Sequence, residues 1–313
     1  MEMTIKWAKK TILGLLFLSC LVMWGETELQ QKRPEVPFVP TPEEVVAAML
    51  RMADVDQDDV LYDLGCGDGR IVITAAKELG CRGVGIEIDL TRIQESRINA
   101  SNAGVSDRVE FLHMDLFEAD ISQATVVTLY LLSKVNRRLR PKLFQELKPG
   151  TRVISHDFSM GEWIPEKSTV IEEKVDYVPF HDTRFVDDYW DKHTVYFWII
   201  PANVSGTWKW TMPTISGKKS YRLEIDQDFQ MLKGKAYEGS ASLPLEIRNG
   251  KIKGDRLEFF LERNDQGHTE KMFFEGIVKN HTVMGFVRIE GNPDFEEKWQ
   301  AKRDPSTRKS IEE

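Results

Sequence analysis

Residues 60–70, which read VLYDLGCGDGR, constrain what this chain can fold into more than any other stretch. Their first half is apolar apart from one acid and predicts a buried strand. Gly65, Gly67 and Gly69 then stand at alternate positions and predict a tight turn, after which an apolar run begins a helix. A strand, a glycine turn and a helix N-terminus in this order form a site for an adenosine-bearing cofactor, because glycine admits positive φ and lets the backbone approach the ligand.

Strands and helices alternate on both sides of this turn. Thr41 stands where a hydroxyl can cap the first of the helices. The alternation predicts a doubly wound, Rossmann-like α/β sheet with parallel strands, which we assign to residues 41–201. The expected helices cover residues 42–52, 71–80, 90–103 and the region of 139–147, and the expected strands cover 60–64, 83–89, 108–115, 124–132, 151–155, 168–178 and 193–201.

The pattern changes after residue 201, where short segments alternate between apolar and polar residues. We assign residues 203–304 to a small antiparallel β-barrel or sandwich and residues 305–313 to a tail. The Asn249–Gly250 pair is a strong signal for a hairpin turn. Gly206–Trp208, which opens the array of hairpins, makes this region similar to the lipocalin-like domains of exported bacterial proteins. Further turns are predicted at Gly234, Gly254, Gly267 and Gly291.

The spacing of the glycines separates two classes of adenosine cofactor. A dinucleotide fingerprint requires glycine at the first, third and sixth positions of the turn. Counted from Gly65, the sixth position is Arg70, and the third glycine comes one place earlier, at Gly69. Acids also close the next two strands. Glu87 can accept both hydroxyls of a ribose, and Asp115 can accept from the amino group of adenine.

The pattern Asp-x-Gly-x-Gly-x-Gly over residues 63–69 resembles motif I of the class I S-adenosylmethionine-dependent methyltransferases. Pro37–Pro42, and Thr151–Phe158 followed by Trp163, are similar to the small seven-strand lysine methyltransferases that act on the ATP synthase c-subunit and the adenine nucleotide translocase. The resemblance implies S-adenosyl-L-methionine as the cofactor, and it implies that the proline-rich segment packs over its methionine end. The residues it implies for cofactor binding are Thr41, Asp63, Gly65, Gly67, Gly69, Glu87, Asp115 and Leu116.

The residues after the fourth predicted strand bear on the methyl acceptor. The Asn-Pro-Pro-Tyr signature of enzymes that methylate nucleic-acid bases or glutamine is absent, and residues 128–132 read TLYLL instead. Tyr130 is a candidate for lining an acceptor channel, and His156 and Asp157 at the end of the fifth strand are candidate catalytic residues. A buried aromatic and a satisfied histidine are the structural alternatives. A lysine acceptor must arrive neutral, which an aromatic channel favours by lowering its pKa.

The leading hypothesis is an S-adenosylmethionine-dependent methyltransferase with a protein lysine as acceptor. A small-molecule or lipid-linked acceptor is the first alternative, and a non-catalytic cofactor-binding protein whose barrel holds a ligand is the second. A net charge of -8 argues against a protein that grips nucleic-acid backbones. The 3 cysteines are too few and too scattered for a disulfide framework or a zinc site, so the sequence predicts no metal.

The N-terminal residues have the layout of an export signal. Three lysines precede an apolar run over residues 11–24 that is short for a membrane-spanning helix. We assign residues 1–25 to a signal peptide or membrane anchor and residues 26–40 to a linker; lipidation at Cys20 and a buried helix of the fold are the alternatives. An exported or membrane-tethered location conflicts with a cofactor made in the cytoplasm, since the positive-inside rule places the rest of the chain outside.

Overall fold

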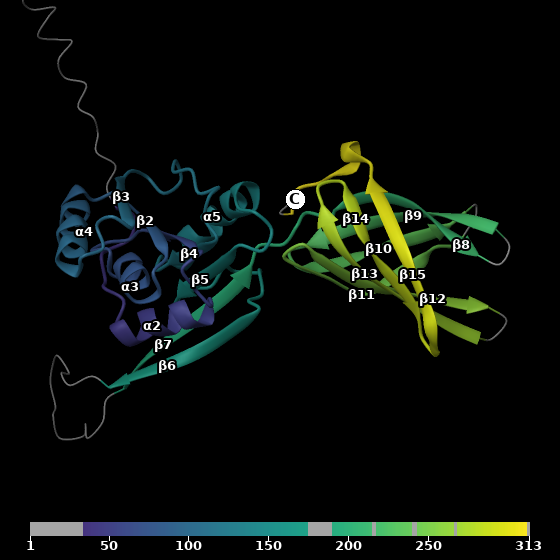
Figure 1. Ribbon diagram of the computed structural model, residues 1–313, viewed down its shortest axis with the longest axis horizontal. Coiled ribbons are helices and arrows are strands. Elements are labelled where there is room, and N and C mark those ends of the chain that lie inside the picture. Colours follow the sequence, from purple (N-terminus) through teal and green to yellow (C-terminus); the bar gives the residue numbers. More distant parts are fainter. Residues whose placement is uncertain (1–33, 175–189, 215–216, 240–242, 266–267, 312–313) are drawn as a thin grey trace, which may run out of the picture. The chain divides into compact units, whose positions relative to one another are not determined.

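The computed structural model describes residues 34–174, 190–214, 217–239, 243–265 and 268–311 (Figure 1). The predicted signal peptide or anchor and Gly267 lie outside these residues. Along the described chain an α/β sheet is followed by a closed β-barrel. None of the described helices combines the length and the apolar character that crossing a membrane requires.

The first region is built on a seven-stranded sheet. Its strands are Val60–Leu64 (β1), Arg82–Glu87 (β2), Val109–His113 (β3), Val126–Leu129 (β4), Arg152–His156 (β5), Lys167–Lys174 (β6) and Trp190–Ile199 (β7). They are ordered β3-β2-β1-β4-β5-β7-β6. Strands β1 to β5 are parallel, whereas β7 runs antiparallel to both β5 and β6.

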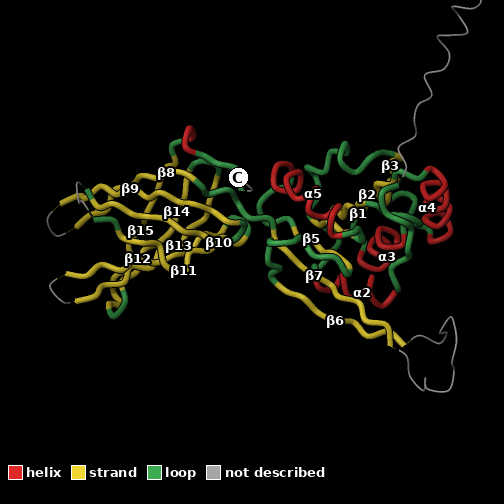
Figure 2. Tube along the Cα trace, turned by 180° about the vertical axis from the view of Figure 1, so that it is seen from behind, coloured by secondary structure: helices red, strands yellow, loops and turns green. Residues whose placement is uncertain are grey.

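This arrangement confirms the Rossmann-like fold, and the five strands expected to alternate with helices are parallel. The sheet is mixed because β6 and β7 pair directly with each other, and an antiparallel pair needs no helical crossover. Figure 2 shows the two strands side by side at the edge of the sheet. Since β7 inserts between β5 and β6, the carboxyl end of β5 lies beside the middle of β7, where His156 pairs with Val195.

Helices cover both faces of the sheet. They span Glu43–Met52 (α2), Arg70–Leu79 (α3), Leu90–Ala103 (α4) and Ser133–Glu146 (α5). Because successive side chains of a strand point to opposite faces, β1 contributes to two apolar clusters. Leu61 packs with buried residues of α2, α3 and α4, whereas Leu64 packs with Leu139 and Leu143 of α5. The carboxyl edge of the parallel strands is thereby left to the connecting loops, where α/β sheets bind ligands.

The predicted hydroxyl cap at the start of α2 is wrong. Pro42 is the N-cap residue of this helix, and no side chain caps it. Thr41 lies one residue too early, and its hydroxyl oxygen instead lies 3.3 Å from His156 Nδ1 at the end of β5. The residue expected to start a helix therefore joins the segment before α2 to the carboxyl edge of the sheet.

The second region is a closed antiparallel barrel, which decides between the barrel and the sandwich expected from the sequence. Its strands are Gly206–Thr214 (β8), Gly217–Asp228 (β9), Met231–Glu238 (β10), Leu245–Lys253 (β11), Arg256–Asp265 (β12), His268–Lys279 (β13), Thr282–Ile289 (β14) and Asn292–Arg303 (β15). Pairing of β15 with β8 closes the circle, at Trp208 and Arg303 among other residues. Phe259, Phe274 and Trp299 pack against one another inside.

Some glycine positions in the barrel do not form the turns expected from the sequence. Gly254 and Gly291 lie in turns between strands, as predicted, but Asn249–Gly250 lies inside β11 at a register shift. Gly234 lies inside β10, where a Cβ would come within 2.0 Å of the Glu224 carbonyl oxygen. These residues therefore mark a bulge and a close approach of strands, which are the other common reasons for glycine in a strand.

Candidate cofactor and acceptor site

The glycine loop between β1 and α3 forms a cradle of bare backbone. Gly65, Gly67 and Gly69 have φ values of 84°, 53° and 81°, a region that side chains other than glycine rarely adopt. A Cβ on Gly67 would lie 2.3 Å from the ring of Phe38, and a Cβ on Gly69 would lie 2.8 Å from the ring of Phe111. Both the conformation of this loop and the packing of the Phe38 and Phe111 rings against it therefore require glycine.

Glu87 ends β2 directly beside this loop. Its Oε2 accepts a hydrogen bond from the N–H of Gly67 at 3.0 Å. Its Oε1 accepts from the N–H groups of Ile88 and Asp89, at 2.8 and 2.9 Å. Two carboxylate oxygens offer about four lone pairs, so the half-buried carboxylate retains capacity for a ligand hydroxyl.

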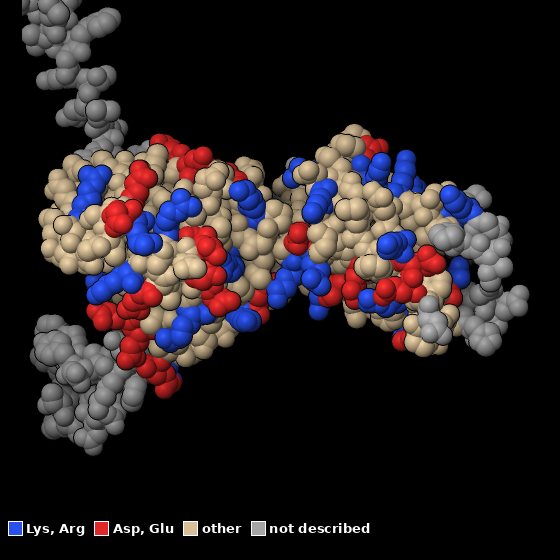
Figure 3. Space-filling view, viewed as in Figure 1, with Lys and Arg blue, Asp and Glu red and all other residues tan. Residues whose placement is uncertain are grey.

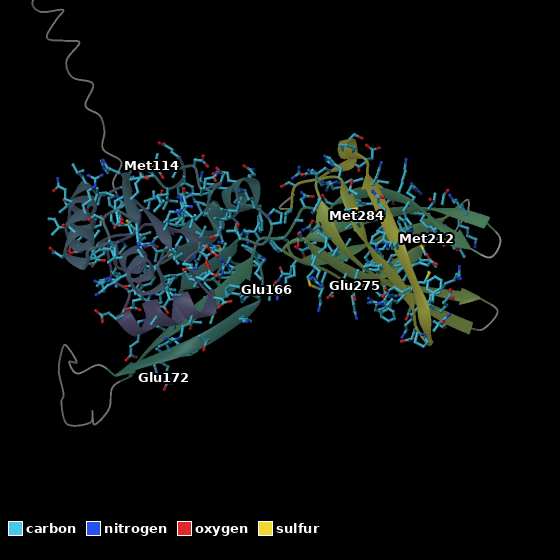
Figure 4. The ribbon with its side chains drawn as sticks, in the orientation of Figure 1. Met114, Glu166, Glu172, Met212, Glu275 and Met284 are labelled. Carbon is cyan, nitrogen blue, oxygen red and sulfur yellow. The ribbon has the colours of Figure 1, made fainter. Side chains whose placement is uncertain are left out.

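Asp115 and Leu116 follow β3, the neighbour of β2 in the sheet. The N–H of Met114 donates to the Glu87 carbonyl at 3.0 Å and holds the two strand ends together; Met114 is labelled in Figure 4. Asp115 is half-buried, and its Oδ1 accepts from the N–H of Phe117 at 2.9 Å. Leu116 packs against the apolar cluster that contains α5. The structure therefore brings the acids after β2 and β3 to one edge of the sheet.

Asp63 lies inside this edge, on β1. Only 3% of the residue is exposed, and Thr128 Oγ1 donates to its Oδ1 at 2.8 Å. Burial raises the pKa of Asp63 from 3.8 to about 7, partly offset by the Thr128 hydrogen bond and reinforced by the nearby Glu87 and Asp68. Burial likewise raises the pKa of the Cys66 thiol, which stays neutral and fills space.

We expect Asp63→Asn to remove a pH dependence of folding stability in the cofactor-free protein. The folded pKa of about 7 lies above 3.8, so the folded state holds this proton more tightly and stability falls as the pH rises between these values. Between pH 5 and 7 the free energy of unfolding of the parent should fall by roughly 2 kcal/mol more than that of the variant. Denaturant unfolding at pH 5 and pH 8 measures this difference, with exposed Asp58→Asn as the control. Equal pH slopes in parent and Asp63→Asn would contradict the assignment.

A segment before α2 lies over the glycine loop. The Phe38 ring contacts Gly67, and the guanidinium of Arg92 in α4 lies 3.9 Å from the centre of that ring. Arg70, at the start of α3, donates to the Thr41 carbonyl at 2.9 Å and forms an ion pair with Asp68 at 2.6 Å. These contacts fix residues 38–41 against the site, and Thr41 itself is 4% exposed.

A second cluster of polar and aromatic side chains lies at the ends of β4, β5 and β7. Tyr130 directly follows β4 and is half-buried, and its ring centre lies 3.8 Å from that of His156. His156 is fully buried, whereas the Asp157 side chain is 27% exposed. His156 Nε2 lies 2.9 Å from His193 Nδ1. The structure thus brings together all three candidate catalytic residues, together with a histidine that the sequence patterns did not indicate.

The backbone at Asp157 is held in an uncommon conformation. Its φ of 58° lies in the left-handed region, which is sparsely populated by residues other than glycine. Asp157 exchanges two 2.7 Å hydrogen bonds with Thr194, one through its backbone N–H and one through Oδ1. Asn136 Nδ2 and Ser155 Oγ both donate to the Phe158 carbonyl, at 2.9 and 2.7 Å. This strained turn is therefore fixed from α5, β5 and β7.

The sequence patterns did not indicate how His193 and Arg70 connect distant segments at the site. His193 stands on β7, 37 positions from His156, and no local spacing connects two positions so far apart. Arg70 was informative only as the residue that excludes a dinucleotide fingerprint, whereas the structure shows that it ties Thr41 to the glycine loop. The juxtaposition of β5 with β7 would have identified His193, but the sequence does not specify the strand order.

The residues present fit S-adenosylmethionine. The glycine loop has the bare backbone that close approach of a ligand requires, and the half-buried Glu87 carboxylate at its side can accept a ribose hydroxyl. When bound, the cofactor supplies a methyl group on a positively charged sulfur. Strand order, glycine loop and strand-end acids together define a class I S-adenosylmethionine-dependent methyltransferase.

Comparison with known proteins identifies a family within this class of methyltransferases. A family profile described as the ANTKMT methyltransferase domain matches residues 63–167. A protein-lysine N-methyltransferase of Saccharolobus islandicus is 53% identical over 141 residues, which are 45% of this chain and 88% of that protein. The chain belongs to the methyltransferase family that includes this relative.

Two further known proteins are similar to part of this chain. The lysine N-methyltransferase of the ATP synthase c-subunit from Mus musculus is 37% identical over 134 residues, which are 43% of this chain and 53% of that protein. A solved structure described as an RNA methyltransferase from Salinibacter ruber with S-adenosyl-L-homocysteine is 55% identical, covers 53% of this chain and 96% of that chain, and has a TM-score of 0.45.

Proposed function

We propose that this protein transfers a methyl group from S-adenosylmethionine to the side-chain amine of a protein lysine. The observation that carries this proposal is the 53% identity to a protein-lysine N-methyltransferase over 88% of that protein's length. The more distant mouse relative is also named a lysine methyltransferase. The absence of Asn-Pro-Pro-Tyr after β4 agrees with an acceptor other than a nucleic-acid base.

The acceptor side of the site suits an amine. Methyl transfer from a sulfonium is an in-line displacement, so the protein mainly positions the nucleophile and removes its water. The Tyr130 ring stacks on His156 and lies 6.1 Å from the ring of Phe158. Partly buried aromatic surface disfavours a charged ammonium and lowers the pKa of an entering lysine, which makes its lone pair available for attack.

The charge distribution gives no support to a nucleic-acid acceptor. The chain has a net charge of -8, and on the face drawn in Figure 3 basic and acidic side chains are interspersed. Proteins that hold nucleic-acid backbones present clustered lysine and arginine, because each phosphate contact depends on a cation. We therefore rank a protein lysine above RNA as the acceptor.

The test is to follow labelled methyl groups from S-adenosylmethionine into a cell extract treated with the full-length protein. Acid hydrolysis of the protein fraction should release the label as methylated lysine, and much less should be released with Glu87→Ala at a cofactor concentration near the parent's Kd. Label in the lipid, metabolite or RNA fraction instead would replace lysine by that acceptor. Calorimetric binding of S-adenosylmethionine without transfer to any fraction would favour a non-catalytic protein whose barrel holds a ligand.

We further propose that the N-terminal residues direct the protein to export or to a membrane. The support lies in the sequence, where lysines precede an apolar run over residues 11–24. A reporter fused after Lys32 should be found outside the cytoplasm or in the membrane fraction. A soluble cytoplasmic reporter would contradict the proposal and would remove its conflict with cofactor supply.

A further inference from the structure

Three side chains of types that bind metals converge where β5 and β7 lie side by side. His156 ends β5, Asp157 follows it, and His193 belongs to the antiparallel neighbour β7. His156 Nε2 lies 2.9 Å from His193 Nδ1, and Asp157 Oδ2 lies 3.2 Å from each of these nitrogens. Within the described parts of the chain, these residues form the group of histidine and carboxylate side chains close enough to share one ion.

Hydrogen bonds among these three atoms do not account for the triangle they form. An imidazole nitrogen carries at most one hydrogen, and an ionised carboxylate oxygen carries none. If both nitrogens direct hydrogens at Asp157, the two nitrogens lie 2.9 Å apart and neither accepts from the other. If only one nitrogen carries a hydrogen, the lone pair of the other faces the carboxylate oxygen at 3.2 Å. Each arrangement leaves one short contact repulsive.

A divalent cation satisfies all three contacts at once. Zinc binds imidazole nitrogens and carboxylate oxygens at about 2.0–2.2 Å, and such ligands lie about 2.9 Å apart at right angles and about 3.3 Å apart at tetrahedral angles. The separations of 2.9 and 3.2 Å fall within this range. We propose that His156, Asp157 and His193 form a binding site for a divalent transition-metal ion, with zinc as the expected species.

The surrounding contacts orient the ligands as a metal site requires. Thr41 Oγ1 lies 3.3 Å from His156 Nδ1, and donation from that nitrogen leaves the Nε2 lone pair for the ion. The N–H of Thr194 donates to Asp157 Oδ1 at 2.7 Å, which leaves Oδ2 directed at the two nitrogens. Two imidazoles and one carboxylate are a donor set that suits zinc, cobalt and ferrous iron, with at least one position left for solvent.

The ion would link β5 to β7 and hold the His156 ring on which Tyr130 stacks. It would therefore fix the position of the aromatic wall on the acceptor side. The inference goes beyond the proposed function, and its test requires neither cofactor nor methyl transfer.

The experiment titrates untagged, full-length protein, first freed of metals with a chelator, with Co²⁺ alone. We expect one equivalent to bind and to give the visible absorption of a cobalt ion in a low-symmetry nitrogen and oxygen site, which Zn²⁺ then displaces. His193→Ala should weaken binding on the order of 100-fold or more, since it removes a ligand. His113→Ala, at an exposed histidine at the end of β3, is the matched control and should bind as the parent does.

Two results would overturn the site. In the first, the parent protein binds no cobalt at stoichiometric concentration, which means that the two histidines and the aspartate form a proton-sharing network. The other is parental binding in His193→Ala, which places the ion elsewhere. His193→Gln keeps a hydrogen-bonding group near Asp157 and protects the test against loss of folding, which thermal unfolding of each variant monitors. Elemental analysis of the protein as purified gives an independent measure of bound zinc.

Discussion

Replacing Glu87 by alanine is expected to weaken S-adenosylmethionine binding roughly 10- to 100-fold while the protein stays folded. Glu87 stands at the carboxyl end of β2 and retains one lone pair for a ribose hydroxyl after accepting three backbone N–H groups. A hydrogen bond to a charged group is worth about 1.5–3 kcal/mol, so the loss of one corresponds to roughly 10- to 100-fold in affinity.

The same substitution also releases the glycine loop. The Gly67 N–H loses the 3.0 Å hydrogen bond that fixes its direction, so binding must then order the loop as well as hold the ligand. Glu87→Gln keeps one acceptor oxygen and should fall between parent and alanine. Glu110→Ala, at an exposed position on β3, should bind as the parent does. Calorimetry measures all four proteins, and parental affinity in Glu87→Ala would place the ribose elsewhere.

The cofactor half of the site could be predicted from the sequence because each of its parts is local. A buried strand, alternate glycines and a helix start occupy residues 60–71 without interruption. Glu87 closes the next predicted strand and Asp115 follows the one after. Parallel strands joined by helices bring such ends to the same edge, so placing these residues requires no knowledge of distant contacts.

The acceptor half depends on pairing between distant segments and could not be predicted in the same way. His193 meets His156 only because β7 inserts between β5 and β6 in antiparallel orientation. Thr41 is a plausible helix cap by its type and position, yet Pro42 is the N-cap residue and the Thr41 hydroxyl lies beside His156 instead. Asn249–Gly250 fails as a turn for a similar reason, since neighbouring strands decide whether positive φ forms a hairpin or a bulge.

Replacing Tyr130 by alanine is expected to lower kcat/KM for the methyl acceptor roughly 100-fold and to leave S-adenosylmethionine affinity unchanged. The ring directly follows β4 on the acceptor side, where it packs against the rings of His156 and Phe158. Without it an incoming lysine loses both the surface that disfavours its charged form and the wall that aligns its lone pair, and a displacement of about 1 Å costs on this order.

The paired control is Tyr130→Phe, which keeps the ring over His156 and should retain activity to within a few-fold. Two measurements distinguish an effect on the acceptor side from one on the cofactor side. Steady-state kinetics follow methyl transfer to the acceptor found by the labelling experiment, and calorimetry measures the affinity for S-adenosylmethionine. A parallel loss of cofactor affinity in Tyr130→Ala would move the residue to the cofactor side. Unchanged transfer would mean that lysine enters elsewhere. Both variants lack the hydroxyl, and only Tyr130→Ala lacks the aromatic surface. If transfer is lost in Tyr130→Ala and retained in Tyr130→Phe, it is therefore the ring that transfer requires.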